Sequence, residues 1–364
     1  MLASTRLAPQ GAWQQRIEAA LERGRNGDTR GGLIALQQCI EAARLAGDKR
    51  GEITALNGAA LMQSIRGDFW ASLAGSIDAF FMARKHGDRP GMAHAMAMLA
   101  GALLLMTPLD REIGLLREAL AIAEEERDIR LQIRIHNLLG ILQGDLARFD
   151  EAGMHLDLAL VLAESDHSGF DRWRLMANIA NLQRKRAQQA HDRNAPVNCS
   201  EHCARGLELI GRVEVHCREH GKVPILLDSL RIAGMLHALQ ARPELAYARY
   251  AAAWTLATHN RQRTALPALG LELGRLALAS GRLNSAENTL AQALQEAAQN
   301  RPSPKAAELN ETMAAVQRAR GERRGEAHWL KEAADSRRDF EALKIEARRQ
   351  IDRVAESVLA EAVL

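Results

Sequence analysis

The stretch NLLGILQGDLARFDEAGMHLDLA, residues 137–159, contains two small residues, Gly140 and Ala159, whose positions recur along the whole chain. The first recurs with a period of about 40 residues, a length typical of helical repeats. Its column is Ala20, Ala60, Ala100, Gly140, Ala180, Gly234, Gly274 and Ala314, with a single shift of phase between Ala180 and Gly234. A fixed period of this kind is the sequence signature of a repeat protein.

A second column of small residues follows the first about half a unit further along the chain. Its members are Cys39, Ala79, Ala119, Ala159, Val213, Ala253, Ala293 and Ala333. Turn residues separate the two columns at Gly27, Gly67, Gly281 and Gly321, and Gly47-Asp48 and Gly87-Asp88 mark further breaks half a period away. Each unit is therefore predicted to be helix, turn, helix, turn, with antiparallel helices that approach closely where the side chains are small.

The composition favours helix throughout. Of the 364 residues, 47% are apolar, only nine are proline, and runs of β-branched residues are nearly absent. The net charge of +3 is small and the charges are interspersed, so we expect no nucleic-acid partner. Four cysteines and a start unlike a signal peptide indicate a reducing, cytoplasmic compartment. The apolar run at 92–106 would be about 22 Å long as a helix, shorter than the roughly 30 Å core of a membrane, and predicts a buried helix.

The repeat resembles the tetratricopeptide repeat. A Leu-Gly pair stands on the first helix at Leu139-Gly140 and Leu273-Gly274, glycine marks the turn, an aromatic residue opens the second helix at Phe69 and Phe149, and alanine follows near its middle. The resemblance covers about residues 12–335, in eight units. The common unit has about 34 residues; units near 40 are similar to sensory or scaffold arrays of bacterial signalling proteins, and HEAT-type arrays also have this length. The Leu-Gly and alanine positions favour the tetratricopeptide form.

The resemblance implies an all-α, right-handed helical-repeat solenoid of about eight helix-turn-helix units, with a groove lined by the first helix of each unit. By their place on that helix, the groove residues are Arg134, Asn137, Arg174, Asn178, Asn181, Arg184 and Lys185, with Arg231 near the edge and Asp228 opposing it. Arginine offers forked charged donors and asparagine offers a donor and an acceptor, so this set suits an acidic or C-terminal peptide. The alternative is that these residues form only the polar face of amphipathic helices.

The shift of phase between Ala180 and Gly234 predicts an insertion, which we place in a loop at 187–200 because this segment is polar and contains Asn, Asp and Pro. The stretch CSEHCARGLELIGRVEVHCREH, residues 199–220, also matches Cys-x3-Cys-x12-His-x3-His, the ligand spacing of a zinc finger. The repeat instead predicts one helix from about 201 to 219, in which Cys203 and His216 stand about 20 Å apart, too far for one metal ion. We therefore expect no metal centre made of these four residues. Two alternatives stay open for His216 and His220: an ion shared with a neighbouring helix or the loop, or a plain surface position near a helix end.

The two ends of the chain fall outside the repeat. Residues 1–11 are expected to be disordered or frayed. Residues 336–364 are predicted to form one capping or connector helix, because no breaker interrupts them and apolar residues recur at steps of three and four from Phe340 to Val358. The end of this helix is too apolar for a solvated cap, which indicates either a homodimer seam or a connector to an output domain, a layout similar to bacterial sensor proteins.

Motifs of catalysis are missing from the sequence: it contains no Gly-rich phosphate loop, no Gly-x-Ser-x-Gly and no His-Glu-x-x-His. We expect a non-catalytic protein without a cofactor, a peptide- or protein-binding scaffold of a bacterial signalling pathway. A small-molecule sensor whose groove closes round its ligand is the alternative. A metal-binding module built on residues 199–220 is a weaker one.

Overall fold

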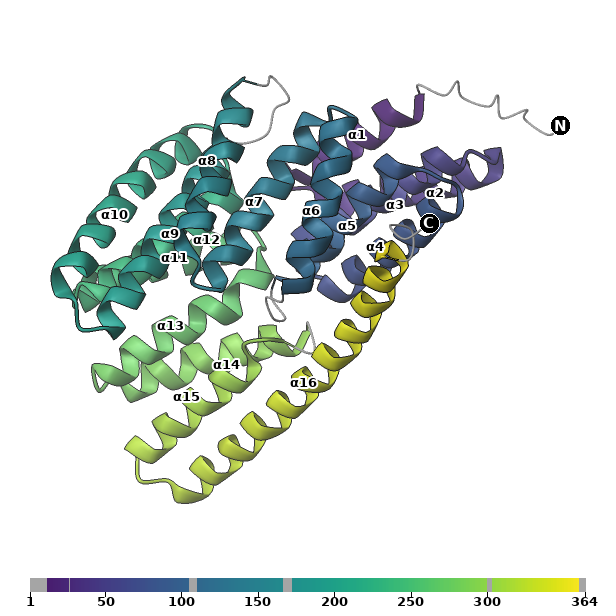
Figure 1. The fold of residues 1–364 in the computed structure, drawn as a ribbon. Coiled ribbons are helices and arrows are strands. Elements are labelled where there is room, and N and C mark those ends of the chain that lie inside the picture. The colour runs from purple at the N-terminus through teal and green to yellow at the C-terminus, as the bar shows by residue number, and fades with distance from the viewer. Residues whose placement is uncertain (1–11, 26, 105–109, 166–171, 300–302, 360–364) are drawn as a thin grey trace. The chain divides into compact units, whose positions relative to one another are not determined.

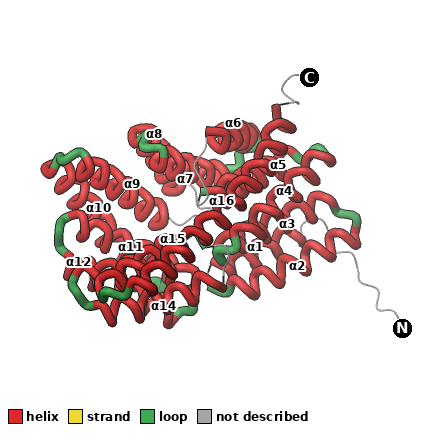
Figure 2. Tube along the Cα trace, turned by 90° about the horizontal axis from the view of Figure 1, so that it is seen from below, coloured by secondary structure: helices red, strands yellow, loops and turns green. Residues whose placement is uncertain are grey.

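The computed structural model describes residues 12–25, 27–104, 110–165, 172–299 and 303–359. Within these ranges it contains sixteen α-helices, one short 3-10 helix and no strand (Figure 1, Figure 2), so the predicted all-α fold is confirmed. Residues 1–11, predicted to be frayed, lie outside the described residues. None of the described helices is both long and apolar enough to cross a membrane. Residues 92–103 of the apolar run at 92–106 are largely buried in a helix, α5, as predicted; residues 105 and 106 lie outside the described residues.

The chain divides into two compact units. The first comprises Met1–Leu142, Ser165–Phe170 and Ala347–Leu364, and the second comprises Gln143–Glu164 and Asp171–Glu346. The helices that begin in the first unit are α1 (Ala12–Arg25), α2 (Thr29–Ala46), α3 (Lys49–Ile65), α4 (Phe69–Lys85), α5 (Arg89–Leu103), α6 (Asp110–Glu125) and α7 (Ile129–Asp145). Those that begin in the second are α8 (Phe149–Ser165), α9 (Arg172–Asp192), α10 (Pro196–Glu219), α11 (Val223–Leu239), α12 (Pro243–His259), η1 (Arg263–Ala265), α13 (Leu266–Ala279), α14 (Leu283–Gln299), α15 (Ala306–Ala319) and α16 (Arg323–Leu359).

Successive helices pack as neighbours inside each unit. In the first unit α1, α3 and α5 form a continuous layer, and α2, α4 and α6 pack behind it. In the second unit α9 contacts α11 and α13 contacts α15, while α10, α12 and α14 pack against these first helices of the hairpins. These first helices therefore lie side by side as α1, α3 and α5 in the first unit and as the pairs α9–α11 and α13–α15 in the second. A helical-repeat protein uses such an arrangement to display side chains along one face.

Both predicted columns of small residues are buried. Every member of the two columns is buried, and most have less than 3% of their surface exposed. A Cβ atom added to Gly234 would lie 2.6 Å from the ring of Tyr250, and one added to Gly32 would lie 2.6 Å from the carbonyl oxygen of Ala20. Helices thus cross so closely at these points that one methyl group does not fit.

We predict that Gly234→Ala lowers the free energy of unfolding by about 1–3 kcal/mol, because the new methyl group overlaps the rigid ring of Tyr250. Gly211→Ala on α10 is the matched control, since its Cβ meets nothing within 4 Å and the residue is exposed. Replacing this helical glycine should raise the stability by about 0.5–1 kcal/mol. Urea unfolding of both variants checks the pair, and equal effects of the two substitutions would contradict the close crossing.

Glycine and aspartate together mark the helix boundaries of the first unit. Gly27, Gly47, Gly67 and Gly87 have positive φ angles of 103°, 70°, 78° and 66°. Each is followed by an aspartate whose Oδ1 accepts a hydrogen bond from the N–H group three residues later; these are Asp28, Asp48, Asp68 and Asp88. The glycine takes the left-handed conformation that ends one helix, and the aspartate caps the next.

The loop predicted at 187–200 is wrong, because the inserted residues are almost all helical. They extend α9 and α10, which have 21 and 24 residues against 17 in each of α7 and α8, and leave only a short turn around Asn194. The extension amounts to about one whole helical turn in α9 and about two in α10, so the buried face of each helix keeps its direction. The added turns bury Ala187, Ala190, Cys199 and Cys203 in one apolar cluster.

The predicted C-terminal helix is part of α16, which begins earlier, at Arg323, and has 37 residues. Of its apolar stripe, Ala347, Ile351 and Val354 have 2% or less of their surface exposed. This part of the stripe is thus covered within the chain. The seam for self-association was predicted nearer the terminus, at Val358, Leu359, Val363 and Leu364, and residues 360–364 lie outside the described residues.

Candidate functional site

Five of the seven predicted groove residues lie on α9. Two of the three cations among them, Arg174 and Lys185, form ion pairs within the protein. Arg174 lies 3.8 Å from Asp228 of α11, and Lys185 donates a hydrogen bond of 2.6 Å to Asp145. Both cations are therefore at least partly neutralised inside the protein. Asn178, like Asn181, is half-buried on the same helix.

Arg184 differs from these two cations because it forms no ion pair with any described residue. Its Nε donates to Oδ1 of Asn181 at 2.8 Å. Burial, followed by the neighbouring Arg231, lowers the pKa of Arg184, whereas Asp145 and Glu272 act in the opposite direction. Asp145 is engaged by Lys185, and Glu272 lies 3.5 Å from Arg275. Arg184 thus keeps its charge half-buried without a carboxylate of its own.

Arg231 completes this surface, which we call the arginine face: Asn181, Arg184 and Arg231. Tyr250, with 1% of its surface exposed, lies in the core next to it. Arg231 lies 4.0 Å from Asp228, at the limit of an ion pair, and its Nη1 contacts the sulfur of Met235 at 3.5 Å. Burial raises the pKa of the Tyr250 phenol, so its hydroxyl group stays protonated and can donate a hydrogen bond.

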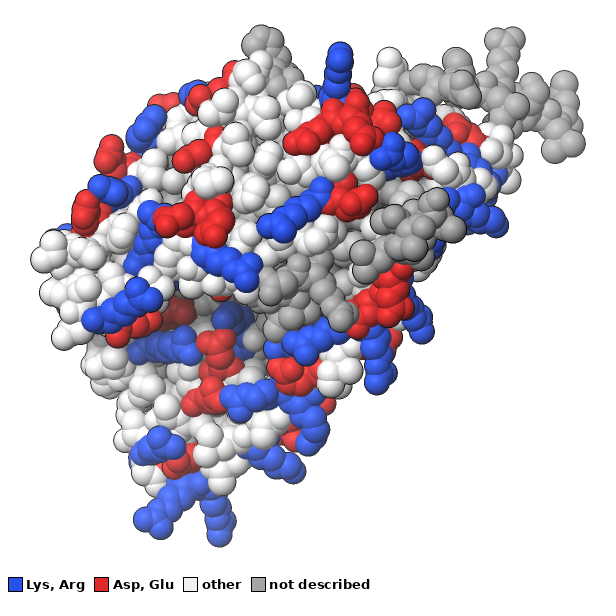
Figure 3. Space-filling model, viewed as in Figure 1, with Lys and Arg blue, Asp and Glu red and all other residues white. Residues whose placement is uncertain are grey.

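Charge around the arginine face is unbalanced. Its cations are Arg174, Arg184, Lys185, Arg231 and Arg275, and its carboxylates are Asp145, Asp228, Glu272 and Glu308, the last of which lies 2.9 Å from Arg275. Positive charge is therefore in excess. Elsewhere, on the side of the molecule drawn in Figure 3, Lys and Arg are interspersed with Asp and Glu, as the sequence predicts. The arginine face is a place where an anionic ligand gains from the local field.

The other two predicted residues, Arg134 and Asn137, lie on α7 in the first unit. Asn137 is buried, with 8% of its surface exposed, so it is not free to meet a partner in the way predicted. Arg134 is half-buried, contacts the sulfur of Met98 at 3.6 Å and lines a cavity of about 680 Å³. The seven predicted residues therefore do not all belong to one unit.

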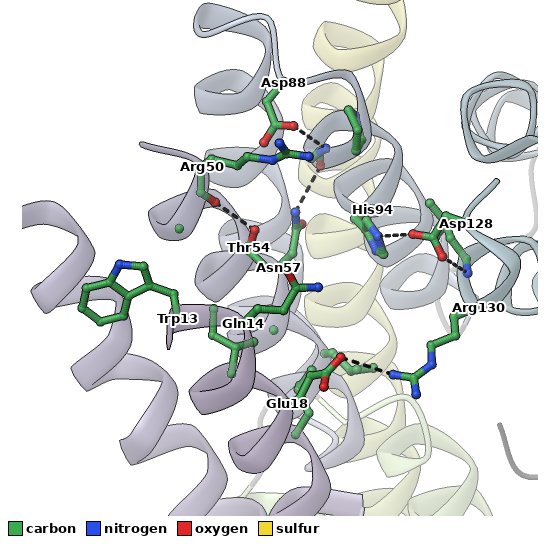
Figure 4. A pocket seen from close by; sticks show the side chains of 18 of the residues that line it. Trp13, Gln14, Glu18, Arg50, Thr54, Asn57, Asp88, His94, Asp128 and Arg130 are labelled. Carbon is green, nitrogen blue, oxygen red and sulfur yellow. Dashed lines mark hydrogen bonds and ion pairs between the residues drawn. The ribbon is translucent and has the colours of Figure 1, made fainter. Parts of the chain in front are cut away.

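The cavity of the first unit is enclosed by α1, α3, α5 and α7 (Figure 4). Nε2 of His94 lies 2.9 Å from Oδ2 of Asp128, whose Oδ1 accepts from the N–H of Leu131 at 2.9 Å. Burial acts to raise the pKa of Asp128, but the hydrogen bonds from His94 and Leu131 outweigh it, and the pKa lies below its usual value. Across the cavity, Arg130 of α7 lies 3.5 Å from Glu18 of α1.

Asn57 of α3 is the most deeply placed polar side chain of those labelled in the cavity (Figure 4), with 8% of its surface exposed. Its Nδ2 donates to the carbonyl oxygen of Gly91 at 3.1 Å. Its Oδ1 has no hydrogen-bond partner among the described residues. Sequence reasoning missed this residue, although a signal existed: Asn57 holds the repeat position of Asn137 two units earlier, and His94 holds that of Arg134 one unit earlier.

The zinc-finger spacing at 199–220 is not used as a finger. Residues Pro196–Glu219 form the single helix α10, as the repeat predicts, with Cys203 fully buried. In one helix Cys203 and His216 are about 20 Å apart. The rings of His216 and His220 stack at a centroid distance of 3.9 Å, and His216 also stacks on Trp173 at 4.4 Å. Because metal ligands use lone pairs in the ring plane, two nearly parallel stacked rings do not converge on one ion.

The chain matches no known protein family and no curated protein sequence. It is similar to solved structures at low identity. The apo form of the quorum sensor NprR from B. thuringiensis is 11% identical with a TM-score of 0.55, covering 88% of this chain and 87% of that one. NprR in complex with its cognate peptide NprX is 13% identical with a TM-score of 0.54, covering 87% and 86%. A Rap protein complexed with competence and sporulation factor is 12% identical with a TM-score of 0.53, covering 94% and 100%. The chain therefore has a tetratricopeptide-like helical-repeat fold.

We predict that Asp128→Asn destabilises the protein by about 1 kcal/mol or less at neutral pH. Asparagine keeps the helix cap on Leu131 but loses the charge that faces His94. Folding lowers the pKa of Asp128, so its carboxylate stabilises the folded protein at pH values above the usual pKa of an aspartate. This stabilisation is lost as the pH falls through the folded-state pKa. The difference between variant and parent should therefore disappear in acid.

Urea unfolding at neutral and acidic pH measures this dependence. Asp68→Asn is the control, since Asp68 also caps a helix, on Ala71, and forms no ion pair with the described residues. If Asp128→Asn lowers the free energy of unfolding by the same amount at both pH values, the charge of Asp128 does not contribute to stability and only its helix cap does.

Proposed function

We propose that this protein is a non-catalytic, cytoplasmic scaffold of a bacterial signalling pathway that binds an acidic peptide segment at the arginine face. The observation that carries this proposal is Arg184, a half-buried guanidinium group without an ion pair among the described residues. A buried charge that lacks a counter-ion costs free energy, and a ligand carboxylate would remove that cost.

The neighbours of Arg184 supply the further donors that a carboxylate needs. Oδ1 of Asn181 accepts from Nε of Arg184, and the two terminal nitrogens of the guanidinium group form no hydrogen bond to the described residues. They can therefore act as a fork for both oxygens of a carboxylate. Arg231 adds a second positive charge. Arg174 and Lys185, which the sequence also predicts for the site, are paired with acids and would contribute mainly to the long-range field.

Proteins with a similar fold support a peptide as the ligand. The NprR structure contains its cognate peptide NprX, and the Rap protein is complexed with competence and sporulation factor. A short peptide can lie extended along a row of first helices, and its acidic residue or C-terminal carboxylate would then meet Arg184 and Arg231. We propose no role for a metal or cofactor in this binding.

Binding of a peptide that ends in Asp-Glu-Glu tests the proposal. We expect Arg184→Ala to weaken it about tenfold or more, because a hydrogen bond to a charged group contributes about 1.5–3 kcal/mol and about 1.4 kcal/mol corresponds to a factor of ten. Arg212→Ala is the matched control, since Arg212 is exposed on α10 without an ion pair in the described structure. Isothermal titration at low and high salt is the measurement, and high salt should weaken the binding of the parent protein.

The same titration with a peptide ending in Asn-Gln-Gln and a C-terminal amide separates charge from shape. A neutral peptide that binds as well as the acidic one, or an equal loss for Arg184→Ala and Arg212→Ala, would rule out recognition of a carboxylate at the arginine face.

A further inference from the structure

We infer that the exposed face of α8 is an interaction surface for a basic amphipathic helix of a partner protein. The surface, which we call the α8 stripe, consists of Met154, Leu158 and Val161. It shares no residue with the arginine face, so the inference does not depend on the proposed acidic peptide. The partner is defined by its chemistry, an apolar stripe bordered by Lys or Arg.

The residues of the α8 stripe are large, apolar and exposed. Met154 has 63% of its surface exposed, Leu158 46% and Val161 62%. Because they follow one another at steps of four and three residues, they lie on one face of the helix. The opposite face packs into the protein, where Leu156 and Ala159 have 1% or less of their surface exposed. A surface helix that packs only against its own array needs one apolar face, and α8 has a second.

The repeat itself provides a comparison for the α8 stripe. Ala159 of α8 belongs to the second column of small residues, and the stripe occupies the positions five and one residues before it and two residues after it. The other helices that carry this column have at most one large apolar residue at these three positions: Ile34 in α2, Phe81 in α4 and Val215 in α10. The repeat fold therefore does not require the α8 stripe. An exposed apolar patch that the fold does not need marks a site of interaction.

Carboxylates border the α8 stripe on both sides. By helical geometry Asp157 and Glu164 lie along one edge and Glu151 lies along the other. All three are exposed and form no ion pair with the described residues. The fourth carboxylate of α8, Asp150, lies 3.0 Å from Arg186 of α9, and α8 itself contains no Lys or Arg. The edges of the stripe are therefore negative and favour a partner that places Lys or Arg against them.

The same carboxylates argue against other occupants of the α8 stripe. A second copy of this chain that docked through its own α8 stripe would bring like charges together, which is destabilising. Anionic lipids and nucleic acids would be repelled in the same way. A helix whose apolar side is bordered by Lys or Arg fits both features of the surface, because side-chain ridges of one helix pack into the grooves of another and the charges at the edges are opposite.

The probe is a fluorescein-labelled peptide of about five helical turns, with leucine at steps of three and four, lysine at both edges of the leucines and alanine elsewhere. We expect this lysine peptide to bind the full chain at one site in the micromolar range, measured by fluorescence anisotropy. The same peptide with glutamate in place of lysine should bind at least about tenfold more weakly, because like charges then meet at the edges of the α8 stripe. If the lysine peptide does not bind in this range, or if both peptides bind equally, the inference is wrong.

Leu158→Gln removes the central apolar side chain of the α8 stripe and should weaken binding of the lysine peptide about tenfold. Leu245→Gln on α12 is the matched control, since Leu245 has 47% of its surface exposed against 46% for Leu158. The control should bind the peptide as the parent protein does. Both substitutions are on the surface and should leave the melting temperature nearly unchanged, which separates lost binding from lost folding. An equal loss for the two variants would contradict the assignment to α8.

Asp157→Lys tests the charged edge of the α8 stripe. It should weaken binding of the lysine peptide by about three- to tenfold, because a repulsion replaces an attraction at an exposed position. Asp78→Lys on α4 is the matched control: Asp78 is also exposed in the middle of its helix and forms no ion pair with the described residues. Equal effects of the two substitutions would show that the peptide responds only to the net charge of the protein, and the inference would fail.

Sedimentation of the chain without peptide tests a second copy as the occupant. If the parent protein forms a dimer that Leu158→Gln dissociates, the α8 stripe is an interface between copies of this chain, and a basic helix of another protein is the wrong partner. Arg184→Ala should bind the lysine peptide normally, and Leu158→Gln should still bind the acidic peptide. Failure of one peptide alone therefore identifies which of the two surfaces is wrong.

Discussion

The close crossing of neighbouring helices at alanine and glycine is the constraint on which both units depend. At Gly32 the neighbour is the backbone of Ala20 itself, and at Gly234 it is the rigid ring of Tyr250, so neither contact has room for a methyl group. A helix pair locked at its closest point has little freedom to slide or rotate. The spacing of the first helices, and with it the spacing of the side chains they display, follows from these small residues.

The two candidate sites differ in electrostatic character, and the way their helices begin explains part of the difference. In the first unit α3, α5 and α7 start with Asp48, Asp88 and Asp128, which place carboxylates beside the arginines of the cavity. In the second unit α10 to α13 start with proline at the first or second position and have no side-chain cap. Proline begins a helix through its fixed φ angle and brings no charge. These four helix starts therefore add no capping carboxylate to the second unit.

Hydrogen-bond balance also separates the two sites. Arg184 has unused donors and can bind an acceptor with negative charge, whereas the unpaired Oδ1 of Asn57 is buried out of contact with solvent. Each imbalance is stable in the folded protein because a neighbour holds the side chain: Asn181 holds Arg184, and Gly91 holds Asn57. Only Arg184 is both fixed in direction and within reach of solvent, so it is prepared for a ligand and loses little entropy when the ligand binds.

The sequence alone determined the helices, their turns and the buried small residues, because each of these follows from a periodic pattern along one chain. It also determined that Cys203 and His216 belong to one helix. The shift of phase indicated an insertion, but its helical structure was not predicted. The added turns of α9 and α10 form new buried contacts, which a polar composition does not reveal. Only the tertiary structure decided which polar residues are free. Arg174 and Arg184 look alike in the sequence, and only packing sets one beside Asp228 and leaves the other without an acid, because Asp228 belongs to a different hairpin that the fold brings against α9.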